Sequence, residues 1–326
     1  MPQLRTPLRA IPWPQYLLPA VFAASGIALH MRGKARLAPM RQLTDHSTFT
    51  APYNLLVYAA SEVPGTPYLE LDRFPDLQAL AERWREIADE GHALLEAGAV
   101  TAATGPNDLG FHTFFKRGWT RFYLRWYGET PPSAQSACPV TTAILEGAPS
   151  IKGAMFAFLP PGAILGRHRD PFAGSLRFHL GLDTPNDDAC WMEVDRVRYS
   201  WRDGEGVLFD ETYVHEVRND TARGRLILLA DVERPLRAPM RQINRLVMRT
   251  VMNATATQNV EGERIGALNQ AFGPIHALLQ LGKPLKARNR KAYYAIKQGV
   301  IAALAAAFIA SLLRPLLRRP RSAAVR

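Results

Sequence analysis

Short segments of alternating apolar and polar residues fill the middle of the chain, from about residue 150 to residue 236. Examples are "GAMFAFLPPGAIL", "SLRFHLGL" and "RLILLADVE", each bounded by turn-forming residues. Because successive side chains of a β-strand point to opposite faces, this period of two predicts half-buried strands. Strands that are this short and this regularly spaced predict a β-barrel or a β-sandwich.

Helical periodicity flanks this β-rich region. Residues 74–98 repeat apolar positions at helical spacing, and we expect Asp76 to cap the start of this helix and Gly98 to end it. The aromatic-rich alternation over residues 111–127 predicts one or two strands. After Pro235 the chain is basic with a helical pattern, which is typical of a solvated helix face or of contact with a membrane surface.

The chain also carries an apolar segment near each of its ends. Residues 10–31 contain no Lys, Arg, Asp or Glu and have aromatic residues near their start, which predicts a transmembrane anchor. Residues 298–313 are apolar but short for a full membrane span. We expect them to cross the membrane, to lie in its interface with water or to enter and leave it on the same side. By the positive-inside rule, the basic residues after the first segment place the central domain in the cytoplasm. Four basic residues follow the first apolar segment, Arg32, Lys34, Arg36 and Arg41, whereas only Arg5 and Arg9 precede it.

Composition narrows the classes of function. The chain has 326 residues, 47% of them hydrophobic, which is enough for a sizeable core. A net charge of +11 suits an anionic membrane surface, a phosphorylated substrate or nucleic acid. No nucleic-acid-binding motif accompanies that charge, so we do not expect nucleic acid as a partner. Cys138 and Cys190 stand far apart, which argues against a disulfide framework and a thiolate zinc site.

One stretch, "GRHRDPFAGSLRFHLGL" at residues 166–182, places several groups that are costly to bury on a predicted strand. His168 and Asp170 are two residues apart and therefore project from the same edge of an extended chain. His215 follows in a later strand. Two imidazoles and one carboxylate form the ligand set of non-haem Fe(II) oxygenases. The alternative is that both histidines are structural and that Asp170 opens a turn.

The sequences around these residues resemble a known family. The stretches "HRDPFAGSLRFHLGL", "TPNDDACWMEVD", "YSWRDGEGVLFDETYVHE" and "ERPL" are similar to the aspartyl/asparaginyl beta-hydroxylase family of 2-oxoglutarate- and Fe(II)-dependent oxygenases, and within it to the lipid A hydroxylase branch. The resemblance covers about residues 155–236. It implies a mainly β fold, a double-stranded β-helix of the jelly-roll or cupin type, with flanking helices and hydrophobic terminal segments.

The resemblance also implies roles for individual residues. His168, Asp170 and His215 would bind iron. The peptide-hydroxylating members lack the aspartate and bind iron through two histidines only. The resemblance therefore supports iron binding more strongly for the two histidines than for Asp170, whose carboxylate would complete the triad.

Three further residues are assigned to the co-substrate and the substrate by the same resemblance. Arg225 would bind the distal carboxylate of 2-oxoglutarate, and His179 would hydrogen-bond this co-substrate. Arg177 would meet an anionic group of the substrate. Ala157 stands where the peptide hydroxylases have a serine that contacts 2-oxoglutarate, so one family contact is missing here.

By resemblance, the function is an Fe(II)/2-oxoglutarate-dependent dioxygenase that uses dioxygen to hydroxylate a lipid acyl chain. The expected substrate is the 2-position of a secondary acyl chain of lipid A, at the cytoplasmic face of a bacterial inner membrane. Alternatives are hydroxylation of an ornithine lipid and peptidyl aspartyl/asparaginyl hydroxylation. A fourth reading is a catalytically inactive membrane lipid-binding protein. No obligate protein partner is expected.

These inferences divide the chain into five regions. We expect an anchor with a basic flank, the first part of the catalytic domain, the double-stranded β-helix core, a basic helical region, and a short membrane-associated segment with a basic tail. Their bounds are 1–40, 41–149, 150–236, 237–297 and 298–326.

Overall fold

Two antiparallel β-sheets form the centre of the protein. The computed structural model describes residues 14–102, 108, 110–280 and 283–296. It divides into two compact units, 25–274 and a second made of 1–24 and 275–326, and both sheets lie in the first. The larger sheet has the order β1 (Tyr68–Leu69), β8 (Gly206–Phe209), β5 (Ser175–Asp183), β10 (Arg225–Glu233), β3 (Ile151–Leu159) and β2 (Thr120–Trp126). The smaller sheet has the order β4 (Ile164–His168), β9 (His215–Asn219), β6 (Cys190–Val194) and β7 (Val197–Ser200).

The connectivity of these strands identifies the fold. From β3 to β10 the chain passes from one sheet to the other at every step except one, from β6 to β7, which are neighbours in the smaller sheet. All neighbouring strands are antiparallel. The inner strand orders are β8-β5-β10-β3 and β4-β9-β6-β7. This is the double-stranded β-helix expected from the sequence, so the predicted mainly β fold class with flanking helices is confirmed.

The larger sheet is buried on both of its faces, which explains the nearly continuous apolar runs of β5 and β10. One face packs on helices, where Phe156, Phe178 and Leu228 meet residues such as Leu77 and Ile87. The other face turns toward the smaller sheet and forms a second core between the sheets. Its members include Met155, Phe209, Leu229, Met192 and Val217.

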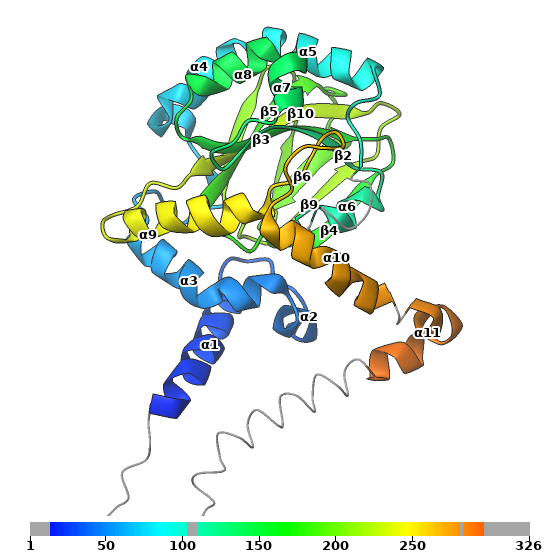
Figure 1. The fold of residues 1–326 in the computed structure, drawn as a ribbon. Coiled ribbons are helices and arrows are strands. Elements are labelled where there is room, and N and C mark those ends of the chain that lie inside the picture. Colours follow the sequence, from blue (N-terminus) through cyan, green and yellow to red (C-terminus); the bar gives the residue numbers. More distant parts are fainter. Residues whose placement is uncertain (1–13, 103–107, 109, 281–282, 297–326) are drawn as a thin grey trace, which may run out of the picture. The chain divides into compact units, whose positions relative to one another are not determined.

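Helices cover the outer face of the larger sheet (Figure 1). They are α4 (Pro75–Glu82), α5 (Trp84–Glu96), α7 (Pro132–Ala137) and α8 (Pro139–Glu146). Gly91 brings α5 close to the sheet, because a Cβ atom at this position would lie 3.1 Å from Leu226 Cδ2 and 3.2 Å from Phe156 Cε1. A larger residue at position 91 would therefore push the helix away from the sheet.

Two local expectations need correction. The helix predicted over residues 74–98 is interrupted at Arg83, and Asp76 lies in its first turn, where its carboxylate accepts a hydrogen bond from the Ser150 amide (2.9 Å). Gly98 follows the helix end with a φ of +67°, as expected of a terminating glycine. The stretch 111–127 forms β2 but begins with the short helix α6 (His112–Phe115).

The remaining helices lie toward the two ends of the sequence. They are α1 (Pro14–Met31), α2 (Pro39–Leu43), α3 (His46–Ala60), α9 (Met240–Val247), α10 (Ala267–Gln280) and α11 (Lys283–Arg288), with 3₁₀ turns at Leu71–Arg73 and Asn253–Thr255 and a π-helical turn at Met248–Met252. The last three helices fall in the region predicted to be basic and helical.

In the part of the chain that the structure describes, no helix combines the length and the hydropathy needed to cross a bilayer. The structure therefore gives no support to the predicted transmembrane anchor over residues 10–31 in its described part, residues 14–31. Helix α1 has 18 residues, about 27 Å of rise, against a hydrocarbon core of about 30 Å. It also contains Gln15, Ser25, His30 and an internal Pro19. Residues 10–13 and the segment 298–313 lie outside the described residues.

Candidate active site

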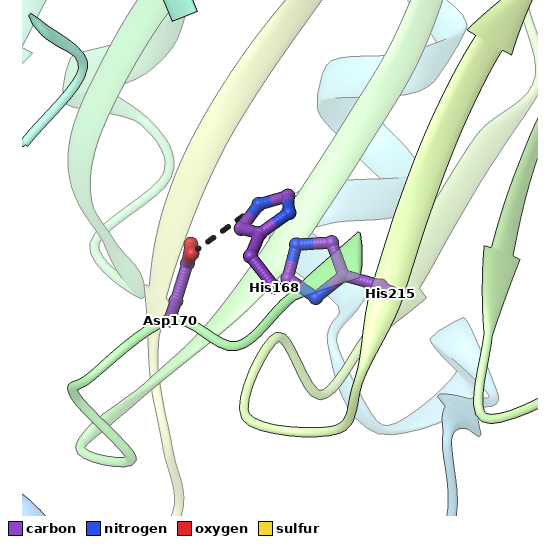
Figure 2. A group of neighbouring side chains, drawn as sticks. All are labelled: His168, Asp170 and His215. Atoms are coloured by element: carbon purple, nitrogen blue, oxygen red, sulfur yellow. Dashed lines mark ion pairs between the residues drawn. The ribbon is translucent and has the colours of Figure 1, made fainter. Parts of the chain in front are cut away.

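Three side chains meet between the two sheets (Figure 2). His168 ends β4, Asp170 follows two residues later, and His215 begins β9. The antiparallel pairing of β4 with β9 sets His168 directly opposite His215, and their ring centroids are 4.1 Å apart. His168 Nε2 lies 3.7 Å from Asp170 Oδ1, and one ligand atom from each of the three residues lies within 4.8 Å of the others. This spacing is that of three ligands around one ion.

Backbone hydrogen bonds orient both imidazole rings. His168 Nδ1 donates to the Gly166 carbonyl (2.8 Å), and His215 Nδ1 donates to the Tyr213 carbonyl (3.0 Å). A carbonyl oxygen can only accept, so each Nδ1 carries the hydrogen and each Nε2 keeps its lone pair. Backbone partners of this kind are typical of metal-binding histidines.

The protonation states of the triad suit metal binding. Burial lowers the pKa of His168, and burial together with His168 lowers the pKa of His215 to about 3. Burial by itself would raise the pKa of Asp170, but the Arg177 guanidinium beside it brings that pKa below its ordinary value. The site therefore offers two neutral imidazoles and one carboxylate, the set that favours a divalent ion such as Fe(II).

Arg177 is the centre of a buried charge cluster. Its side chain is 9% exposed and donates from Nη2 to Asp170 Oδ2 (2.9 Å), and it also forms an ion pair with Glu211. Its Nε lies 3.2 Å from Asp231 Oδ1. One guanidinium is thus shared by three carboxylates.

Hydroxyl groups complete this cluster. Tyr127 Oη donates to Asp231 Oδ2 (2.9 Å), and Ser175 Oγ donates to Glu211 Oε1 (2.9 Å). Burial raises the pKa of Glu211 well above its usual range, and it raises the pKa of Asp231 as well, with Arg177 opposing both shifts. The cluster holds Asp170 by its Oδ2 atom, while Oδ1 is the oxygen that faces His168.

Arg225 has the opposite environment. It begins β10, is 2% exposed, and its Nε and Nη1 atoms have no hydrogen-bond partner. No carboxylate among the described residues pairs with it, and burial lowers its pKa to about 10. Its guanidinium lies 4.3 Å from the Trp201 ring, and His179, whose Nδ1 is also buried without a partner, stacks on the same indole. A buried cation without a counter-ion is costly, so this end of the site suits an anion.

One pocket joins the triad, Arg177, Arg225 and His179. Much of its wall is apolar or aromatic, and Phe114 from α6 meets the His168 ring edge-on at 5.0 Å. The apolar lining residues are Phe111, Phe114, Trp119, Leu165, Met192, Phe209, Val217 and Leu229. The pocket thus combines a metal-binding triad, an unpaired cation and an apolar wall.

All six residues singled out from the sequence line this pocket, and their assigned roles stay predictions. The surroundings of Arg177 argue against its predicted role of binding an anionic group of the substrate, because three carboxylates already surround its guanidinium. Sequence reasoning missed Glu211 and Asp231 as members of the site. The acid inside the apolar run "RLILLADVE" was a usable signal, since a buried carboxylate requires a partner. Asp210 is structural, because it pairs with Arg32 and Arg234 at 2.8 Å each.

Comparison with known proteins supports the resemblance read from the motifs. Residues 81–235 match the family model described as aspartyl/asparaginyl beta-hydroxylase, so the predicted resemblance to that family is confirmed. This match includes all strands from β2 to β10 and every pocket residue named above.

Two curated relatives and one solved structure illustrate the similarity. An ornithine lipid ester-linked acyl 2-hydroxylase of Rhizobium tropici is 37% identical over 131 residues, 40% of this chain and 47% of that protein. The human aspartyl/asparaginyl beta-hydroxylase is 29% identical over 182 residues, 54% of this chain and 23% of that protein. The chain thus spans less than half the length of either. A Pseudomonas putida prolyl-4-hydroxylase structure matches at 21% identity and a TM-score of 0.33, over 48% of this chain and 88% of that one.

Proposed function

We propose that this chain, whose central region matches the aspartyl/asparaginyl beta-hydroxylase family model, is an Fe(II)- and 2-oxoglutarate-dependent dioxygenase that hydroxylates a lipid acyl chain. The observation that carries the proposal is one pocket that contains both a His-Asp-His triad and a buried arginine without a counter-ion. A dicarboxylate that binds a metal at one end and a cation at the other would satisfy both.

The residues fit the proposed metal and co-substrate. His168, Asp170 and His215 would hold Fe(II), which supplies the oxidising power to functionalise an unactivated C–H bond when dioxygen and 2-oxoglutarate are present. Arg225 would pair with the far carboxylate of 2-oxoglutarate, and its unpartnered Nε and Nη1 atoms are the donors available for it. His179 would hydrogen-bond the same molecule, and Trp201 packs beside both.

An apolar substrate fits the rest of the pocket. Phe111, Phe114 and Trp119 supply an aromatic wall near the triad, and Arg177 has no free charge for an anionic peptide side chain. Burying a hydrocarbon chain against such a wall gains about 0.8 kcal/mol per methylene group. The lipid specificity of the Rhizobium tropici relative agrees with this interpretation.

Two lipids are candidates for the acyl chain. The sequence motifs favour the 2-position of a secondary acyl chain of lipid A. The 37% identity to an ornithine lipid ester-linked acyl 2-hydroxylase favours an ornithine lipid. Both substrates would be available at the cytoplasmic face of a bacterial inner membrane, where we place the enzyme. The two cysteines, both free and buried, are compatible with that reducing compartment.

Mass spectrometry of lipid extracts tests the proposal. A host that makes both lipids would express the intact chain, His168→Ala or the matched control His92→Ala, which alters a histidine on α5 that is 41% exposed and pairs with Asp183. We expect one added oxygen on an acyl chain with the intact chain and with His92→Ala, and none with His168→Ala. The class of lipid that gains the oxygen decides between lipid A and ornithine lipid. Unmodified lipids of both classes in all three strains would contradict the proposal.

A further inference from the structure

The α2–α3 segment presents apolar side chains to solvent beside the strand and loop that carry His168 and Asp170. Met40 and Leu43 on α2 are 60% and 65% exposed, and Phe49 and Leu56 on α3 are 70% and 62% exposed. The last two are seven residues apart and so share one stripe of their helix. The opposite stripe of α3 is buried, through Ser47, Ala51, Asn54 and Val57. The four exposed side chains on these two neighbouring helices are here called the α2–α3 surface.

Hydrogen bonds fasten this segment to the loop of the metal triad. His46 Nε2 donates to the Arg169 carbonyl (2.9 Å), and Asn54 Nδ2 donates to the Pro171 carbonyl (2.9 Å). Asn54 Oδ1 accepts from the Ala173 amide (3.0 Å). Because these bonds lie on either side of Asp170, they fix α3 to the loop that carries this residue.

The exposed charges carried by the segment of residues 32–60 have one sign. Lys34, Arg36 and Arg41 are exposed, and no carboxylate among the described residues pairs with them. The only acid between residues 32 and 60 is Asp45, which is buried and accepts from the Ser47 amide as the cap of α3 (3.0 Å). Large apolar side chains among unpaired cations are typical of surfaces that rest on anionic bilayers.

We propose that the α2–α3 surface lies on an anionic lipid bilayer, with Met40, Leu43, Phe49 and Leu56 in the headgroup boundary and the neighbouring cations on lipid phosphates. This inference rests on the proposed lipid substrate and adds which surface of the chain contacts the bilayer. A protein partner or a second copy of the chain would cover the apolar stripe equally well, but neither requires a segment whose exposed charges are all positive.

Site-specific labelling of the full-length chain tests the placement. Cys138 and Cys190 are both 0% exposed, so an environment-sensitive fluorophore can be attached at Phe49→Cys, with Val197→Cys as the matched control on β7, where Val197 is 46% exposed. Vesicles of equal parts phosphatidylcholine and phosphatidylglycerol should shift the emission of the label at position 49 to the blue and leave the label at position 197 unchanged. The shift should weaken with added salt or with phosphatidylcholine alone. A silent label at position 49, or equal shifts at both positions, would overturn the proposal.

Introducing acidic side chains into the surface supplies an independent measurement. Leu43→Glu combined with Phe49→Glu should weaken the apparent affinity for the mixed vesicles by roughly tenfold per side chain. The matched pair Val197→Glu with Val260→Glu should leave it unchanged. Equal losses in both pairs, or none in the first, would contradict the docking surface. A blue shift that appears without vesicles as the protein concentration rises would instead indicate a second copy as the occupant and would also overturn the proposal.

A detergent assay separates this inference from the proposed function. If lipid dispersed in micelles gains oxygen but the label at position 49 stays silent on vesicles, the docking proposal fails and the enzymatic proposal stands. If the label shifts but no lipid gains oxygen, the proposed function fails.

Discussion

Arg177 and Arg225 occupy the same pocket, are both almost completely buried, and differ in one respect. Three carboxylates surround Arg177, whereas Arg225 has no counter-ion among the described residues. A buried arginine that is fully paired serves the structure around it, here by holding Asp170 in place. A buried arginine that is unpaired is costly in the free protein, and that cost is recovered when an anion binds. The contrast separates the metal end of the pocket from its co-substrate end.

Removing a metal ligand should have the largest effect. His215→Ala deletes one of two oriented imidazoles, and we expect turnover to be abolished while the double-stranded β-helix remains folded. Lipid mass spectrometry and circular dichroism of the purified variant check this. Normal turnover would remove His215 from the metal site.

Arg177→Met should have the second largest effect, because it should lower both the stability of the fold and the affinity for the metal. Without the guanidinium, three buried carboxylates face one another, and breaking a buried pair costs about 3–5 kcal/mol of folding free energy. Loss of the hydrogen bond to Asp170 should also weaken metal binding by about 10–100-fold. Urea unfolding and calorimetric metal titration measure the two effects.

Arg177→Lys is the informative companion to that variant. It retains the charge but not the fork that reaches several carboxylates, so we expect an intermediate loss of metal affinity. If metal binding is unchanged in both variants and only the lipid KM rises, Arg177 binds substrate and does not position Asp170.

Arg225→Met should not destabilise the free protein, in contrast to Arg177→Met. It removes an unpaired buried charge, so the free energy of unfolding of the free protein should stay unchanged or rise. The affinity for 2-oxoglutarate should fall by about 2–5 kcal/mol, because the carboxylate loses its buried partner. Urea unfolding with and without 2-oxoglutarate separates these effects. Destabilisation comparable to that of Arg177→Met would erase the distinction between the two arginines.

Per pH unit, the smallest expected effect is the pH dependence of the metal-free protein. The folded pKa of His215 is about 3, whereas an unfolded histidine titrates near 6.5. The unfolded chain therefore binds a proton that the folded chain excludes, and stability falls as pH drops from about 6.5 toward 3. The slope is at most about 1.4 kcal/mol per pH unit for this group. Chelator-treated wild type and His215→Gln, unfolded in urea at several pH values, should differ by this slope, and equal slopes would contradict the assignment.

Much of the fold was predictable because it depends on local periodicity. The period-two pattern of residues 150–236 predicted the strands, and the two-residue spacing of His168 and Asp170 predicted that they share an edge. The pairing of His168 with His215 depends on strand register, which the sequence does not encode locally. It was reached by resemblance.

Other parts depended on tertiary contacts. The run 111–127 reads as strand throughout, yet its first part folds as α6 and places Phe114 against His168. Glu211 and Asp231 were missed because their common partner, Arg177, lies 34 residues from one and on a neighbouring strand from the other. The anchor over residues 10–31 was predicted from its lack of charge, but the polar residues and prolines of α1 lower its hydropathy.

Calorimetric titration of 2-oxoglutarate into the anaerobic, Fe(II)-loaded protein tests the central claim most directly. The wild type should bind the co-substrate, and Arg225→Met should bind it much more weakly. His168→Ala should bind both Fe(II) and the co-substrate more weakly than the wild type does. Failure of the Fe(II)-loaded wild type to bind 2-oxoglutarate, or equal binding by Arg225→Met, would contradict the assignment of this pocket.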